Sequence, residues 1–254
     1  MPLLPSENGS RAVPYYALRH LFAGMAITAV GFGFFVLRPD LMVVENVQFN
    51  GHQRAGALEL RHLSDFRNGT TLWGVDTAEV VRAVERHPWV KHANAELLWP
   101  ATLRIEISEY EPVALVYYDG LYYVDAYGTV ILKATSNDLN YPVLTGMGPE
   151  LEAVHPELAR VVLHDATWLL RELTAGDGLS ASDISEVHFS RERGFVVHAH
   201  QSQIVFGVEE LERRIRRLSL MLEHGLKLGQ PVVVDLVSDS VAIVRPQNNP
   251  GITG

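Results

Sequence analysis

Three histidines in the C-terminal half of the chain have a spacing that could bind a metal ion. His198 and His200 are two positions apart, so a β-strand would place both imidazoles on one face. His188 could supply a third ligand across a hairpin, and no other ligand is evident. Exposed strand histidines are the simpler interpretation, so we predict no metal site here.

Three carboxylates could act as a general acid and a general base, namely Glu106, Glu109 and Glu111. Glu106, however, alternates with Ile105 and Ile107, a pattern typical of a strand with one solvated face. The chain has no cysteine and lacks a nucleophile elbow, a P-loop and a dinucleotide-binding fingerprint. We therefore predict no catalytic residue, no cofactor, no small-molecule substrate and no enzymatic activity.

The densest basic cluster lies on a predicted helix, largely opposite the apolar stripe of that helix. The cluster consists of Arg213, Arg214, Arg216 and Arg217, and the stripe of Leu211, Ile215 and Leu218. We interpret the arginines as a solvated helix face rather than as a dedicated contact site. The whole chain has a formal charge of −9, which argues against nucleic acid as a partner because phosphate contacts require a basic surface.

One uninterrupted apolar run near the start of the chain indicates a membrane anchor. The run from Leu21 to Leu37 contains no charge and no proline. As a helix rising 1.5 Å per residue it would span about 26 Å, close to the thickness of a bilayer core. It is longer than a secretory h-region and lacks a cleavage site at its end. We therefore predict a retained transmembrane helix at residues 21–37.

The charges around this run predict its orientation. Arg11 and Arg19 precede it, whereas one arginine and two carboxylates follow closely. The positive-inside rule then places residues 1–20 in the cytoplasm as a short tail. The rest of the chain would lie on the other side of the membrane, in the arrangement of a single-pass type II protein.

Residues 42–111 show the pattern of a small β-α-α-β-β module. The predicted elements are strands at 43–49, 89–98 and 102–109 and helices at 57–63 and 76–84. Asp76 with Glu79 three residues later resembles a capping box at the start of the second helix. Trp73, Trp89 and Trp99 lie in apolar contexts and are interpreted as core or turn packing.

Several short motifs in this module, in this order and at this spacing, resemble one known family. They are Val47-Gln48-Phe49-Asn50-Gly51, Gly69-Thr70-Thr71-Leu72-Trp73-Gly74-Val75-Asp76, Pro88-Trp89-Val90, Trp99-Pro100-Ala101-Thr102-Leu103-Arg104-Ile105 and Glu109-Tyr110-Glu111-Pro112-Val113-Ala114. Together they resemble the FtsQ/DivIB family of bacterial cell-division proteins, in which a POTRA domain directly follows a membrane helix. The resemblance extends from the predicted anchor to near the C-terminus.

Residues 112–246 show the pattern of a mixed β domain with two amphipathic helices. The predicted strands are at 113–118, 121–124, 129–132, 184–189, 194–200, 204–206, 232–237 and 241–244, and the helices at 151–173 and 208–222. This arrangement resembles the β domain of the FtsQ family. Residues 247–254 are predicted to be a disordered tail. The expected fold class is thus α+β, with a single N-terminal transmembrane helix, a POTRA domain and a β domain.

The resemblance implies a non-enzymatic scaffold of the bacterial divisome. It implies docking of the FtsB–FtsL pair, which helps to control septal peptidoglycan synthesis, with FtsK, FtsW and FtsI as further partners. It also implies a location in the inner membrane at the division septum, with the folded domains in the periplasm. The alternative is a POTRA-containing envelope transport or assembly protein.

The last predicted strand is the candidate partner-binding site. A terminal strand at a sheet edge exposes unpaired N–H and C=O groups, which can accept a partner strand. The candidate residues are Ser240, Val241, Ala242, Ile243, Val244 and Arg245, and the family resemblance adds Arg193. The family more often has Arg-Tyr where this chain has Val237-Ser238, so side-chain contacts at that position do not carry over.

Overall fold

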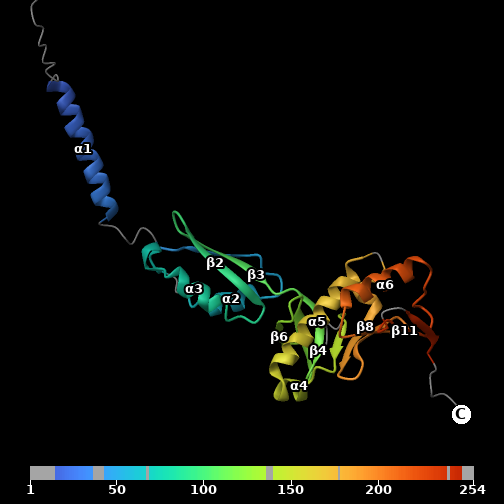
Figure 1. Cartoon of the computed structure of the whole chain (residues 1–254). Coiled ribbons are helices and arrows are strands. Elements are labelled where there is room, and N and C mark those ends of the chain that lie inside the picture. Colours follow the sequence, from blue (N-terminus) through green and yellow to red (C-terminus); the bar gives the residue numbers. More distant parts are fainter. Residues whose placement is uncertain are drawn as a thin grey trace, which may run out of the picture. The chain divides into compact units, whose positions relative to one another are not determined.

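The computed structural model describes residues 15–36, 43–66, 69–135, 140–176, 178–238 and 241–247. These residues form two compact units (Figure 1), each described here by itself. The first unit takes in the described residues up to Gly51 together with residues 56–84 and 93–107, and the second includes residues 108–254. The second unit also takes in two short segments, residues 52–55 and 85–92.

The N-terminal helix α1 runs from Tyr15 to Val36 and contains most of the predicted anchor. Its large apolar side chains Leu21, Met25 and Ile27 are exposed. Within the described residues, we find no helix with both the length and the apolarity that crossing a bilayer requires. The predicted span ends at Leu37, which lies outside the described residues, as do residues 1–14 of the predicted tail.

The first unit is built on a three-stranded sheet of described residues, in the order β1-β3-β2. Its elements are β1 Asn46–Asn50, α2 Ala57–Leu63, a 3₁₀ turn Leu72–Gly74, α3 Thr77–Val84, β2 Val90–Leu98 and β3 Thr102–Glu109. β1 lies parallel to β3, with Asn46 opposite Thr102. β2 and β3 form a hairpin, so this order confirms the predicted β-α-α-β-β module (Figure 1).

The predicted register of β3 is confirmed. Leu103, Ile105 and Ile107 are all buried, whereas Glu106 is exposed. This alternation follows from the period of two along a strand, which turns every second side chain toward the helices. The predicted cap is also present, since Asp76 Oδ1 accepts hydrogen bonds from the backbone N–H groups of Ala78 and Glu79 at 2.9 and 3.1 Å.

The second unit contains a nine-stranded sheet of described residues, in the order β12-β11-β10-β9-β8-β7-β4-β5-β6. The strands are β4 Pro112–Tyr117, β5 Leu121–Asp125, β6 Val130–Lys133, β7 Val143–Thr145, β8 Ile184–Ser190, β9 Gly194–Ala199, β10 Ser202–Gly207, β11 Val232–Asp235 and β12 Ile243–Pro246. The helices are α4 Pro149–Val154, α5 Pro156–Thr174 and α6 Leu211–Glu223, with a 3₁₀ turn at Ala181–Asp183.

The main core of this unit lies between the sheet and the helices α5 and α6. From the strands it includes Val187, Val197 and Phe206, and from the helices Leu169 and Leu218, all of them buried. The other face of the sheet carries a smaller buried cluster of Val196, Val205 and Val233. These two clusters lie on opposite faces because neighbouring strand residues point in opposite directions.

The single helix predicted at residues 151–173 is wrong, because the structure divides it into α4 and α5. Pro156 lacks a backbone N–H and disfavours helical backbone at His155, which has φ −143° and ψ 70°. Leu158 and Val161, two apolar residues of the predicted amphipathic helix, are 39% and 55% exposed.

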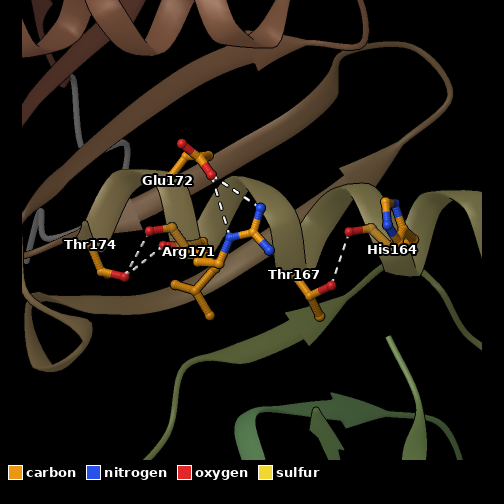
Figure 2. A network of polar contacts seen from close by, with 6 residues as sticks. His164, Thr167, Arg171, Glu172 and Thr174 are labelled. Carbon is orange, nitrogen blue, oxygen red and sulfur yellow. Dashed lines mark hydrogen bonds and ion pairs between the residues drawn. The ribbon is translucent and has the colours of Figure 1, made fainter. Parts of the chain in front are cut away.

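Polar side chains on α5 bond mainly within the helix itself (Figure 2). Thr167, which is fully buried, donates its hydroxyl proton to the carbonyl of His164 at 2.9 Å, and Thr174 donates to the carbonyl of Leu170 at 2.9 Å. Arg171 pairs with the neighbouring Glu172 at 3.1 Å. Such back-bonding satisfies the hydroxyls locally and sets up no reactive constellation.

Candidate functional site

The last strand, β12, lies at one edge of the nine-stranded sheet as far as the described residues extend. It runs antiparallel to β11, with Val244 opposite Val234 and Arg245 opposite Val233. All four of its residues are exposed. The strand spans Ile243–Pro246, two residues later at each end than the predicted 241–244, and the candidate residue Ser240 lies outside the described residues.

The backbone groups of β12 divide between its neighbour and the open edge. Gln247 donates its N–H to the carbonyl of Pro231 at 2.8 Å, so the amide of Gln247 faces the β11 side. Amides two residues apart on a strand point the same way, which places the N–H groups of Ile243 and Arg245 toward β11. The N–H of Val244 then points to the open edge. Gln247, assigned by sequence to the tail, is thus tied to the sheet.

The backbone nitrogen of Pro246 faces the open edge and not β11. The missing N–H of this proline therefore costs no hydrogen bond to β11. Edge strands tolerate proline only in this orientation. The proline therefore ends the row of outward donors after Val244. A strand added outside β12 could pair with Val244 and with the backbone preceding it, but it would find no donor at Pro246.

The side chains of β12 extend both faces of the sheet to its edge. Val244 lies on the core face with its partner Val234, and Ala242, just before the strand, packs against the main core. Ile243 lies on the opposite face, opposite Asp235, with an exposed fraction of 52%. Apolar surface is thus open on both faces beside the unpaired backbone edge, an arrangement that suits an added strand with apolar residues on both sides.

Arg193 lies in the turn between β8 and β9, where its N–H bonds to Ser190 Oγ at 3.2 Å. One pocket is lined by Arg193 together with Asp235 and Val237. Asp235 pairs with Ile243 of β12, so the turn and the start of β12 lie at the same end of the sheet. Three strand spacings of about 4.8 Å separate β9 from β12, so one extended partner could reach both.

The prediction that the arginines of α6 form a solvated face is wrong for Arg214. This side chain is 6% exposed. Its guanidinium donates to the carbonyl of Phe206 at the end of β10 and to the carbonyl of Val237 at 3.0 Å. Buried cations require such partners, because an unpaired charge inside a protein is strongly unfavourable. Arg214 therefore joins α6, β10 and the segment that leads to β12.

Two further features help to hold the segment that leads to β12 in place. Arg217 donates to the carbonyl of Ser238 at 2.6 Å. Gly207 has φ +71°, and a Cβ there would lie 2.5 Å from the Arg214 guanidinium, so glycine leaves the space that the arginine occupies. No signal in the sequence distinguished Arg214 from Arg213 and Arg216, except its place one residue before the apolar Ile215 on the predicted stripe.

The histidine candidates are not brought together as a metal site. His198 lies on β9 opposite Glu186, whereas His200 follows the strand in a turn with φ 52° and approaches Asp183 at 3.6 Å. His188 Nδ1 is 2.7 Å from Thr145 Oγ1 on β7. The described residues contain no group of three or more potential ligands that could hold a metal ion.

Glu109, at the end of β3, bonds to a loop that lies far from it in the sequence. Its carboxylate accepts hydrogen bonds from the backbone N–H groups of Gln53, Arg54 and Ala55 at 2.8–3.2 Å. Burial opposes ionisation of this carboxyl, but the three backbone donors outweigh burial and hold its pKa below the ordinary value. The donors lie more than fifty residues before Glu109 in the chain, so the residues next to Glu109 do not indicate these hydrogen bonds.

Beside Glu109, an arginine is surrounded by aromatic rings within the second unit. The Arg54 guanidinium lies 4.8 Å from the centre of the Trp89 ring and donates to the Tyr141 hydroxyl at 2.9 Å. Trp89 and Tyr123 are 5.2 Å apart, centre to centre. This packing confirms the structural interpretation of Trp89, and cation–π contact adds to it.

Trp99 was expected in core or turn packing, and it lies in the turn between β2 and β3 with 75% of its side chain exposed. The side chain of Trp73 lies outside the described set. Of the three tryptophans, one thus packs against other aromatic rings and one projects into solvent. The local sequence could not distinguish them, because Trp89 and Trp99 are both followed by apolar residues and both precede or open a strand-like segment.

The fold and the candidate site define a class of protein: a POTRA module followed by a β domain with an open terminal edge. Residues 42–110 match the family model "POTRA domain, FtsQ-type". The chain is 34% identical to the cell division protein FtsQ of Anaeromyxobacter sp. (strain K) over 73% of the chain and 64% of that relative. It is 31% identical to FtsQ of Geobacter sp. (strain M21) over 72% of the chain and 69% of the relative.

A third relative, FtsQ of Rhodothermus marinus, is 29% identical over 92% of this chain and 88% of its own length. The chain thus spans just under two thirds of the Anaeromyxobacter relative and most of the Rhodothermus one. The chain belongs to the FtsQ family of cell division proteins, which confirms the resemblance drawn from its motifs.

Proposed function

We propose that this protein is a scaffold of the bacterial divisome that docks the FtsB–FtsL pair by strand addition to β12. The observation that carries the proposal is the exposed terminal strand with the outward N–H of Val244. Backbone hydrogen bonds at such an edge supply affinity, and pockets for alternate side chains supply specificity. Arg193 lies at the same end of the sheet and offers a cation to an acidic side chain of the partner.

The docking site in this proposal comprises Arg193 and residues 240–245. Residues 42–111 form the POTRA domain, which would aid recruitment, and residues 112–246 form the β domain. FtsK, FtsW and FtsI are further proposed partners. Family membership alone supports FtsK, FtsW and FtsI as partners, whereas β12 offers a defined surface for FtsB.

The proposal includes a membrane anchor at residues 21–37, with residues 40–254 in the periplasm at the division septum. It is supported by the uncharged run in the sequence, by the arginines that precede it, and by the exposed apolar side chains of α1. An anchor would tether both folded units to one membrane. Resistance of the full chain to alkaline extraction of membranes tests this part.

A matched pair of proline variants tests strand addition. Val244→Pro removes an N–H that faces the open edge, so the β domain should fold normally and lose capture of FtsB. Arg245→Pro removes an N–H that faces β11, so it should loosen β12 itself and lower the thermal midpoint of unfolding. Arg245→Ala controls for the loss of the arginine side chain and should keep both the fold and most of the capture.

Circular dichroism and capture of FtsB by the tagged full-length variants supply the two measurements. If Val244→Pro folds and captures FtsB as well as the unmodified chain does, docking by strand addition at β12 is wrong. In that case Arg193→Glu is the next variant, because it changes the same end of the sheet without altering β12.

A further inference from the structure

The turn between β2 and β3 exposes a large aromatic side chain at one end of the first unit. Trp99 is 75% exposed, and Pro100 beside it is exposed as well. Leu97 and Leu98, which precede them, are only partly covered. We call Leu97–Ala101 the hairpin tip. An exposed tryptophan at the end of a hairpin contributes little to the core, although its ring carries a large apolar area.

The hairpin tip lies where the chain enters this unit from α1. The backbone N–H groups of Glu45 and Asn46 both donate to the carbonyl of Ala101, at 2.9 and 3.2 Å. β1 then runs parallel to β3, away from the tip, starting with Asn46 opposite Thr102. The end of the unit that is tied to the entering chain is therefore the end that carries Trp99.

The length of chain between α1 and this entry point limits how far the tip can be from the helix. Eight residues separate Val36 from Glu45, and nine extended steps span at most about 32 Å. The far end of β3, at Glu109, lies about 27 Å beyond the tip at the usual strand rise of 3.4 Å. The connection therefore limits the tip to a shorter maximum distance from α1 than it limits the far end of β3 at Glu109.

We propose that the hairpin tip inserts Trp99 into the polar–apolar interface of the same bilayer that holds α1. This inference rests on the proposed membrane anchor. Tryptophan is enriched at this depth of a membrane because its ring is amphipathic, with an apolar body and one N–H donor. A short tether would keep the tip at a high local concentration near the lipid, so a single ring can be enough.

The charges near the tip specify the kind of lipid contact. Glu45 and Glu96 are both exposed beside it. Two carboxylates would be repelled by anionic headgroups, so attraction of opposite charges cannot drive the contact. The insertion should therefore occur in neutral phosphatidylcholine, depend little on salt, and weaken rather than strengthen when anionic lipid is added.

Fluorescence quenching in the reconstituted full-length protein tests the inference. The protein is placed in phosphatidylcholine vesicles whose acyl chains are brominated close to the headgroup, and the loss of tryptophan emission is measured. The chain has four tryptophans, so the contribution of one is taken by difference. We expect clear quenching in the unmodified chain and a several-fold smaller quenched fraction in Trp99→Ser. Trp168→Phe, on α5 of the second unit, is the matched control and should retain the quenching.

Each outcome decides the inference. An anchored protein without quenching overturns the insertion of Trp99 and leaves the anchor standing. A protein removed from the vesicles by alkaline extraction overturns the anchor and the insertion together. Quenching that requires anionic lipid and disappears in salt overturns the apolar contact. Absence of quenching, combined with loss of FtsB capture in Trp99→Ser, would instead assign the tip to a protein partner.

Discussion

The edge strand β12 and the β2–β3 hairpin tip are both exposed and apolar, but they expose different things. β12 presents a row of backbone groups with modest side chains, Ile243 at 52% and Val244 at 46% exposed. The tip presents one large ring, Trp99, on the short turn that joins β2, an edge strand of its sheet, to β3. The first surface is suited to an extended partner strand, and the second to the interface of a lipid bilayer.

This difference predicts which substitutions affect each surface. Removal of a side chain at β12 leaves its N–H and C=O groups in place, so proline is needed to abolish docking there. Removal of the ring at the tip deletes the surface altogether. The two surfaces also differ in support, because β12 depends on contacts from α6 whereas the tip is part of a continuous hairpin.

The largest expected effect comes from loss of the support beneath β12. Arg214→Met should lower the free energy of unfolding by about 2–4 kcal/mol, because the carbonyls of Phe206 and Val237 lose a buried donor. The freed segment should also weaken FtsB capture without changing the lipid contact of the tip. Arg216→Met is the matched control, since Arg216 is exposed and approaches Glu212 only at 3.8 Å. It should change stability by less than about 0.5 kcal/mol.

Urea denaturation of the soluble fragment after α1 measures both variants. Equal stability of Arg214→Met and Arg216→Met would show that the buried guanidinium does not hold the segment before β12. In that case β12 would not depend on contacts from α6 and would be positioned by its pairing with β11 alone.

A smaller effect is expected from Glu109, at the far end of β3 from the tip. Glu109→Gln should lower the free energy of unfolding by about 1–2 kcal/mol near neutral pH, a figure reduced for solvent screening of a partly exposed group. The folded pKa of Glu109 is lowered, so its contribution is full above the ordinary value of 4.5 and is lost as pH falls through the folded pKa. Stability measured from pH 7 to pH 3 should therefore fall less steeply in Glu109→Gln.

Glu109→Gln also tests whether the two ends of β3 act independently, because the hairpin tip and Glu109 lie at opposite ends of this strand. Quenching of Trp99 by brominated lipid should be unchanged in Glu109→Gln. A parallel pH dependence in both proteins would mean that the three backbone donors do not hold the carboxylate ionised. A loss of quenching would mean that the two ends of β3 are coupled.

The smallest effect is expected from a side chain of β12. Ile243→Ala should weaken FtsB capture by no more than about 1 kcal/mol, the usual scale of a cross-strand side-chain pair. Its backbone donors are retained, so docking should survive. Isothermal titration with a soluble FtsB fragment measures the change. A loss as complete as that expected from Val244→Pro would indicate a side-chain pocket rather than strand addition.

Local patterns in the sequence predicted much of the first unit correctly. The alternation around Ile105 predicted a strand and the face that is buried, and Asp76 predicted a helix start. Both are decided by neighbours a few residues away, through the period of a strand and the bonding of a cap. The apolar stripe at residues 151–173 was less reliable, because Pro156 interrupts the helix although the hydrophobic spacing continues.

Residues whose partners are distant in sequence could not be assigned from local patterns. Arg214 was interpreted as part of a solvated helix face, and the bonds of Glu109 were not predicted, yet each side chain bonds to backbone groups brought to it by folding. Trp99 was expected in core or turn packing, and it lies in a turn with its ring exposed. The sequence gives the identity of each of these side chains. Whether the side chain is buried depends on which loop or strand lies beside it in the folded protein.

The sequence by itself determined the family, the α+β class and most of the order of the elements, because hydrophobic period, caps and turns act over a few residues. It did not predict the short strand β7 or the break between α4 and α5. It did place a strand near the C-terminus. Only the tertiary structure decided that this strand pairs on one side with β11 and that its Val244 amide faces outward. Pairing and burial depend on contacts between segments far apart in the chain, and local sequence does not encode which amide is left without a neighbour.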